Sequence, residues 1–136
     1  MKLNKEEIET IVNHRLQKSQ ETLDEAKKIA EIGLWYSAAN RLYYACYYAV
    51  TALLIKNEYF AYKHSEVLAL LGKHFVLENM LSEEHNKLYR RIFELKQNGD
   101  YGDMIVIQKE DVIPLLEPAE KFIAEIEILI NKNNIK

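Results

Sequence analysis

The residues best suited to chemistry are tyrosines grouped around Arg41. Five of the nine tyrosines fall between residues 36 and 48. Tyr44 follows Arg41 by one helical turn and Tyr48 by two, so a helix would place these three side chains on one face. A guanidinium among phenol rings can hold a phosphate or a base. Because each buried tyrosine also needs a hydrogen-bond partner, the segment predicts a lined groove or a close helix contact.

A second candidate group lies in residues 98–103, where Asp100 and Tyr101 stand between two glycines and Asp103 follows the second. Two glycines and two aspartates so close together predict a loop, because they interrupt both helical and strand periodicity. This loop either contributes to a site or is a turn that ties the fourth helix to the second. Arg41 has the same two interpretations: it faces a ligand, or it forms a structural ion pair with Asp100 or Asp103.

A third candidate pair, Lys63 and His64, opens a predicted helix. Exposed backbone amides at a helix start attract anions, which favours a binding role. The alternative is that His64 or Ser65 caps the first turn. No two histidines lie close in sequence beside a carboxylate, so no metal site is expected, and no cofactor. Cys46 is the only cysteine and lies in an apolar helix, which predicts a buried, inert thiol.

The elements that must position these residues are helices, because apolar residues recur at spacings of three and four along nearly the whole chain. The sequence predicts an all-α fold, an antiparallel bundle of four long helices plus one short helix. Expected helices cover residues 4–32, 35–56 and 65–75, a fourth begins after Ser82, and a fifth follows from Lys109. Pro114 and Pro118 predict a kink, or a separate short turn before the main helix starts near Pro118. The first, second, fourth and last helices should form the core.

Length and charge set further bounds. The 136 residues predict a single domain covering 1–136, and a net charge of −3 gives no general attraction to nucleic acid, so any such binding needs a local basic patch. The longest apolar run, residues 42–55, is too short to span a bilayer. With no secretory signal at the N-terminus and one cysteine, a cytoplasmic protein is expected.

Four blocks of the sequence, in this order, carry a resemblance to a known family: SAANRLYYA at 37–45, KHS at 63–65, GKHF at 72–75 and FELKQNGDYGD at 93–103. They resemble the HEPN (higher eukaryotes and prokaryotes nucleotide-binding) domain. The resemblance implies a helical bundle, commonly a homodimer, often encoded beside a minimal nucleotidyltransferase in a toxin–antitoxin pair. Many members are metal-independent ribonucleases that use an arginine followed a few residues later by a histidine.

That ribonuclease pair is missing from this sequence. No arginine is followed by a histidine at the required spacing, and Tyr48 occupies the last position of the window after Arg41. A tyrosine with an ordinary pKa near 10 cannot exchange protons at neutral pH as imidazole does. The expectation is therefore a non-catalytic HEPN binding module, a homodimer and partner of a nucleotidyltransferase, in contact with nucleotide or RNA.

The residues expected to make that contact are polar or aromatic: Arg41, Tyr44, Tyr48, Lys63, His64, Lys96, Asp100, Tyr101 and Asp103. One alternative is a metal-independent ribonuclease in which Arg41, His64 and a residue of the 98–103 loop assemble in space. A second is a purely structural dimerisation module. The resemblance also implies adenylylation by the partner enzyme, for which Tyr101 is the expected acceptor.

Overall fold

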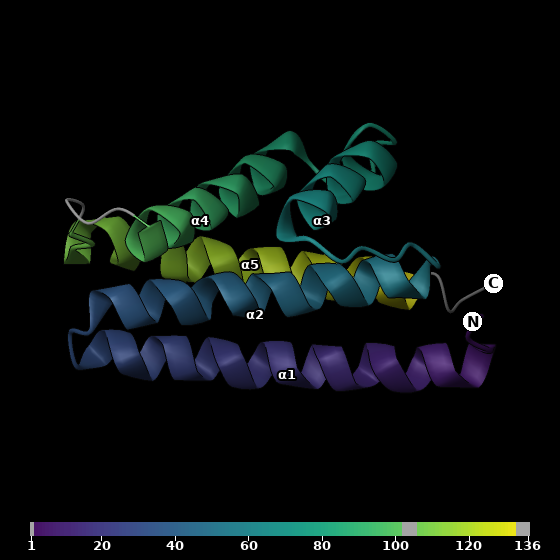
Figure 1. Ribbon diagram of the computed structural model, residues 1–136, viewed down its shortest axis with the longest axis horizontal. Helices are drawn as coiled ribbons and strands as arrows, with labels where there is room; N and C mark the ends of the chain where they lie inside the picture. The colour runs from purple at the N-terminus through teal and green to yellow at the C-terminus, as the bar shows by residue number, and fades with distance from the viewer. Residues whose placement is uncertain (1, 102–105, 133–136) are drawn as a thin grey trace.

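The computed structural model describes residues 2–101 and 106–132, except for the side chain of Tyr101. In chain order the elements are α1 (Lys5–Glu31), α2 (Trp35–Lys56), α3 (His64–Leu71), a π-helical turn η1 (Gly72–Val76), α4 (Glu83–Tyr101) and α5 (Lys109–Lys132). Helices α1, α2 and α5 run side by side, and α3 and α4 lie across one side of them (Figure 1). The predicted all-α bundle is confirmed.

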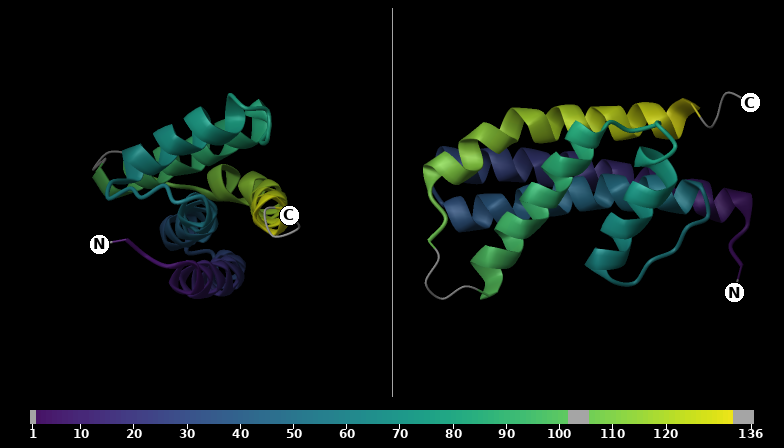
Figure 2. Two further views of the ribbon diagram at one scale, coloured as in Figure 1. Left: turned by 90° about the vertical axis from the view of Figure 1, so that its right-hand side faces the viewer. Right: turned by 90° about the horizontal axis from the view of Figure 1, so that it is seen from above.

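Helix α2 is the centre of the bundle. It packs against α1, α3, α4 and α5, and the end-on view places it between α1 and the α3–α4 layer (Figure 2). None of the described helices is long and apolar enough to cross a membrane.

The α1–α2 hairpin follows from local signals in the sequence. Asn4 and Glu7 form a reciprocal capping box at the start of α1, with hydrogen bonds of 2.8 and 3.0 Å. Gly33 ends the helix with a φ of +77°, a conformation that costs glycine little, as predicted. Small residues then let the two helices approach closely. The Oγ of buried Ser19 in α1 donates to the carbonyl of Ala45 in α2 at 2.7 Å.

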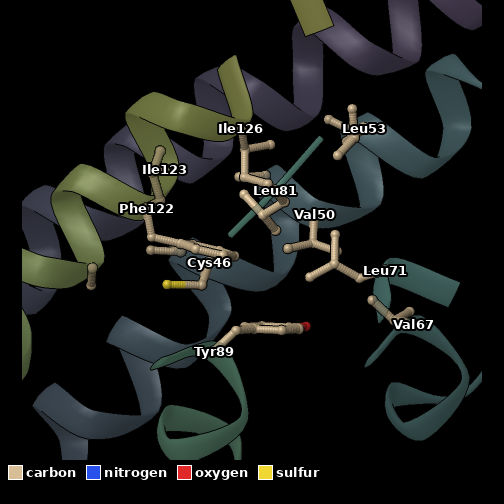
Figure 3. Close-up of a cluster of buried hydrophobic side chains, with 14 of the residues drawn as sticks. Cys46, Val50, Leu53, Val67, Leu71, Leu81, Tyr89, Phe122, Ile123 and Ile126 are labelled. Carbon is tan, nitrogen blue, oxygen red and sulfur yellow. The ribbon is translucent and has the colours of Figure 1, made fainter. Parts of the chain in front are cut away.

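The core lies between α2 and the surrounding helices α1, α3, α4 and α5, so the predicted first, second, fourth and last helices all contribute, and α3 contributes as well. Figure 3 shows Cys46 and Val50 of α2 close to Phe122 and Tyr89, which come from α5 and α4. The Tyr89 ring stacks on Phe122 at 5.6 Å between centroids and on Tyr43 at 6.1 Å. An aromatic stack therefore links three helices through the interior.

The two prolines do not divide the last helix. Helix α5 is continuous from Lys109 to Lys132, so the predicted separate turn before Pro118 is wrong. Buried Val112, Leu115 and Ala119 flank the prolines on the face that packs inward. Their burial offsets the loss of about 3 kcal/mol that a proline costs in a helix interior.

The predicted loop at 98–103 is also wrong at its start. Asn98, Gly99 and Asp100 continue α4, which extends to Tyr101. Gly99 is needed for close packing, because a Cβ there would lie 2.6 Å from Cδ1 of Ile107 and 2.8 Å from Cδ1 of Tyr36. The glycine thus marks a tight contact in a helix rather than a turn. Asp103 lies outside the described residues.

Candidate functional site

Cationic and aromatic side chains from three helices surround the half-buried ring of Tyr44. Arg41, one turn earlier in α2, places Cζ 5.1 Å from the ring centroid. Lys96 of α4 brings Nζ to 5.6 Å, and the imidazole of His64, the first residue of α3, lies at 5.8 Å. We refer to Arg41, Tyr43, Tyr44, Tyr47, His64 and Lys96 as the Tyr44 cluster. The predicted site residues Arg41, Tyr44, His64 and Lys96 thus lie together.

His64 is held by tyrosines rather than used as a helix cap. The N-cap of α3 is Lys63, and no side chain caps it, so the expected capping by His64 or Ser65 is wrong. Instead the imidazole stacks on Tyr47 at 4.6 Å, and its Nδ1 shares a hydrogen bond of 2.5 Å with the Tyr43 hydroxyl. Packing of α3 against α2 brings about this contact, whereas the Lys63 side chain is exposed.

Burial favours the neutral forms of both groups in this hydrogen bond, the Tyr43 phenol and the His64 imidazole. Desolvation raises the pKa of Tyr43 well above its ordinary value, so the side chain stays a neutral phenol. Desolvation, with the nearby Lys96 charge second, lowers the pKa of His64, which favours neutral imidazole at pH 7. The phenol can donate to Nδ1, and Nε2 then carries the imidazole proton.

Lys96 is anchored by a carboxylate. Its Nζ lies 2.7 Å from Oδ2 of Asp100, and the Tyr36 hydroxyl donates to Oδ1 of Asp100 at 2.5 Å. Desolvation raises the pKa of Asp100, but the hydrogen bonds from Lys96 and Tyr36 outweigh it and leave the pKa below its ordinary value. The carboxylate is therefore ionised at neutral pH and balances the Lys96 charge.

Among the described residues, Arg41 contacts a side-chain amide and an aromatic ring rather than a carboxylate. The suggested pairing of Arg41 with Asp100 is wrong, because Asp100 binds Lys96 and Tyr36, and the suggested pairing with Asp103 lies outside the described residues. None of the ion pairs formed within residues 2–101 and 106–132 includes Arg41. Its guanidinium donates to Oδ1 of neighbouring Asn40 at 3.0 Å and lies against Tyr44. Arg41 is thus a partly exposed cation on an aromatic surface.

The remaining candidates lie at the edge of the cluster or beyond the described residues. The Tyr48 ring is 6.0 Å from Tyr44 and has Lys18 of α1 at 5.0 Å on the same ring. The side chain of Tyr101 and all of Asp103 fall outside the described part of the chain. Within that part, no group of three or more histidine, cysteine or acidic side chains is arranged to hold a metal ion.

Sequence reasoning missed Arg15. Its guanidinium donates to Oγ1 of Thr51 at 3.1 Å and lines a pocket that also includes Tyr47. A usable signal was present, because Arg15 lies three residues after buried Val12 and four before buried Ser19. That spacing places it on the face of α1 that contacts α2.

Comparison with known proteins agrees with this architecture. The family model of the HEPN domain matches residues 12–129. A UPF0332 protein from Thermotoga maritima is 38% identical over 124 residues, which cover 91% of this chain and 94% of that protein. A Methanocaldococcus jannaschii protein named Putative toxin MJ0142 is 30% identical over 97% of this chain and 88% of its own length.

The fold also occurs in a solved structure. TT1696 from Thermus thermophilus superposes with a TM-score of 0.73 over 87% of this chain and 97% of its own, at 17% sequence identity. At that identity the likeness concerns the fold alone. The HEPN model matches most of the chain, and the relatives named above match it over most of their own length. The chain belongs to the HEPN domain family.

Proposed function

We propose that the protein is a non-catalytic HEPN binding module that holds single-stranded RNA on the Tyr44 cluster. The observation that carries the proposal is the arrangement of Arg41, Lys96 and His64 around one half-buried tyrosine ring. Single-stranded nucleic acid binds where cations follow the backbone and aromatic rings accept stacked bases. Arg41 and Tyr44 supply both within one turn of helix α2, and Lys96 and His64 add to them from α4 and α3.

Arg41 provides the charge in this proposal. The net charge of the chain is −3, so only a local cation can attract a phosphate. Lys96 is balanced by Asp100, whereas no ion pair among the described residues includes Arg41. A guanidinium can bind a phosphate through two parallel N–H groups.

A binding role requires no proton transfer, and the cluster offers few groups suited to it. Burial raises the pKa of both Tyr43 and Tyr47, so neither phenol readily releases its proton at neutral pH. Single-stranded RNA needs only charge and exposed rings, both of which the cluster has.

RNA binding by the purified protein tests the proposal directly. We expect fluorescein-labelled decauridine to bind in a fluorescence anisotropy assay at low salt, and Arg41→Ala to weaken binding roughly 10-fold through loss of a charge-assisted contact. The dependence of log K on log salt should flatten by about 0.7 for one lost phosphate contact to a single strand. The control is Lys28→Ala, an exposed lysine in the last turn of α1. Equal affinity of wild type and Arg41→Ala would refute the proposal.

The toxin–antitoxin setting belongs to the same proposal. Relatives that carry the name Putative toxin support a toxin–antitoxin setting. Within it, the chain acts in this proposal as a homodimer whose partner is a nucleotidyltransferase. Exposed apolar side chains such as Leu77 and Met80, at 75% and 50% exposure, offer contact surface for a second chain. Light scattering should give twice the chain mass of 16.0 kDa, and co-expression with the product of the neighbouring gene should give a complex. A monomer at micromolar concentration contradicts the dimer.

A metal-independent ribonuclease is the second candidate, because Arg41 and His64 both contact the ring of Tyr44. Both side chains lie against Tyr44, so they can reach one phosphodiester. In that case His64 takes the other tautomer, in which Nδ1–H donates to the Tyr43 hydroxyl oxygen and Nε2 acts as the base, and Arg41 stabilises the phosphorane charge. Incubation of RNA with protein in EDTA distinguishes the candidates. Cleavage that is lost in both Arg41→Ala and His64→Gln, and kept in Lys28→Ala, establishes the enzyme; intact RNA with tight binding supports the binding module.

A further inference from the structure

A small pocket lies beside the Tyr44 cluster, between α1, α2 and the connection that leads to α3. Its volume is about 240 Å³, and its walls include Arg15, Tyr47, Thr51, Tyr59 and Ala61. Pockets for drug-sized ligands are roughly 300–1,000 Å³, so this one has room for a single planar ring system.

Arg15 gives this pocket a specific chemistry. One guanidinium nitrogen donates to Oγ1 of Thr51 at 3.1 Å, and Thr51 in turn donates to the carbonyl of Tyr48 at 3.0 Å. Thr51 is only 7% exposed, so the guanidinium is anchored to a rigid wall. No ion pair formed by the described part of the chain includes Arg15. Its other N–H groups suit a flat ligand that presents two neighbouring acceptors.

Aromatic rings around the mouth fit a ligand of this shape. Phe60 and Tyr62 line the pocket and are 49% and 92% exposed, so their rings are accessible to a ligand. Tyr47 also lines the pocket, and its ring stacks on His64 at 4.6 Å. The pocket therefore shares Tyr47 with the Tyr44 cluster, and the Tyr47 and Tyr44 rings are 5.9 Å apart.

We infer that this pocket receives an unpaired guanine of the RNA whose backbone lies on the Tyr44 cluster. The inference rests on the proposed function. Guanine presents O6 and N7 as adjacent acceptors, the pair that arginine binds with two N–H groups, whereas adenine presents a donor in place of O6. Bases of single-stranded RNA are recognised when they splay out and stack on aromatic side chains. Arg15 supplies the fork, and Tyr47, Tyr59 and Phe60 supply the rings.

Base preference in the anisotropy assay tests the inference. The probes are decauridine and the same strand with one central guanosine or one central adenosine. We expect the guanosine to tighten binding roughly 10-fold and the adenosine to change it less than about 2-fold. Arg15→Lys keeps the charge but removes the fork, so it should abolish the guanosine preference and leave decauridine affinity within about 2-fold. Arg90→Lys, at an exposed arginine of α4, is the matched control and should keep the preference.

A second variant guards against misfolding of the first. Ala61→Phe fills the pocket from the connection between helices and should remove the guanosine preference without touching Arg15. Thermal unfolding shows whether each variant is folded. Titration of guanosine or adenosine alone, followed by NMR, reports the pocket without any phosphate; amide shifts at Thr51 and Ala61 with guanosine alone are expected.

The outcomes separate the two proposals. Decauridine binding without a guanosine preference, or a preference that survives both Arg15→Lys and Ala61→Phe, overturns the guanine pocket and leaves RNA binding intact. If no RNA binds, the proposed function fails and the nucleoside titration decides: guanosine-specific shifts support the pocket, and their absence overturns it.

Discussion

Gly99 is helical yet tightly surrounded, so replacing it with alanine should destabilise the protein although alanine favours helices. Propensity alone predicts a gain of about 1 kcal/mol. The new Cβ, however, would lie 2.6 Å from Ile107 Cδ1 and 2.8 Å from Tyr36 Cδ1. Cδ1 of Ile107 is the tip of a flexible side chain and can turn aside, so the Tyr36 ring is the main obstacle. The Tyr36 ring can only move as a whole, which breaks its hydrogen bond to Asp100.

These opposing terms determine the expected size of the effect. Overpacking costs about 1–3 kcal/mol, and a hydrogen bond to a charged group contributes about 1.5–3 kcal/mol. Tyr36 is 46% exposed, which reduces the second figure. After the propensity gain is subtracted, we expect Gly99→Ala to lower the free energy of unfolding by about 1–2 kcal/mol.

Urea unfolding followed by far-ultraviolet circular dichroism measures this change. In a Tyr36→Ala background the main clash is gone, and Gly99→Ala should then be neutral or stabilise by up to about 1 kcal/mol. Gly72→Ala is the control, because a Cβ at Gly72 meets no atom within 4 Å and should stabilise. Our reasoning is refuted if Gly99→Ala stabilises the wild type, or has the same effect in both backgrounds.

Three further predictions concern buried polar groups. Ser19→Ala removes the bond to the Ala45 carbonyl and should lower the free energy of unfolding by about 1 kcal/mol in urea titration; no change would show that the bond contributes nothing. Because the folded protein lowers the pKa of His64, the unfolded chain binds more protons, so stability should fall as pH drops below about 6.5. His64→Phe should flatten this fall in thermal melts between pH 7 and 5, and an unchanged slope would contradict the assignment. Burial raises the pKa of Cys46 to about 12, so Ellman's reagent should label it only after unfolding; rapid labelling of native protein would show access to the thiol.

The sequence predicted the helices well where local rules decide them. The apolar stripe of α1 and the glycine at position 33 set the first boundary, and the structure ends α1 at Glu31. Fourth-helix residues 98–100 were mistaken for a loop because glycine and aspartate are strong turn signals by themselves. Gly99 is instead selected by packing against Tyr36 and Ile107, which are far away in the sequence. Such contacts leave no local pattern.

Part of the candidate site followed from helical spacing and part did not. Arg41 and Tyr44 are one turn apart on one helix, so their contact could be predicted. The contact of His64 with this pair depends on how α3 folds back over α2, and the Lys96–Asp100 pair depends on α4 continuing past Gly99. Arg15 comes from α1 and meets Tyr47 only through packing of the hairpin. Tertiary packing, which periodicity does not encode, assembles these parts.

The stack of Tyr43, Tyr89 and Phe122 connects the Tyr44 cluster at the surface to the hydrophobic core. Tyr43 stacks on Tyr89, and Tyr89 stacks on Phe122, so the imidazole held by Tyr43 is braced by a column of rings that reaches α5. A ligand would meet a rigid lining and lose little entropy in ordering it. For the same reason, truncating Phe122 would remove support from Tyr89 and Tyr43 and so make the position of His64 less fixed, although α5 contributes no residue to the Tyr44 cluster.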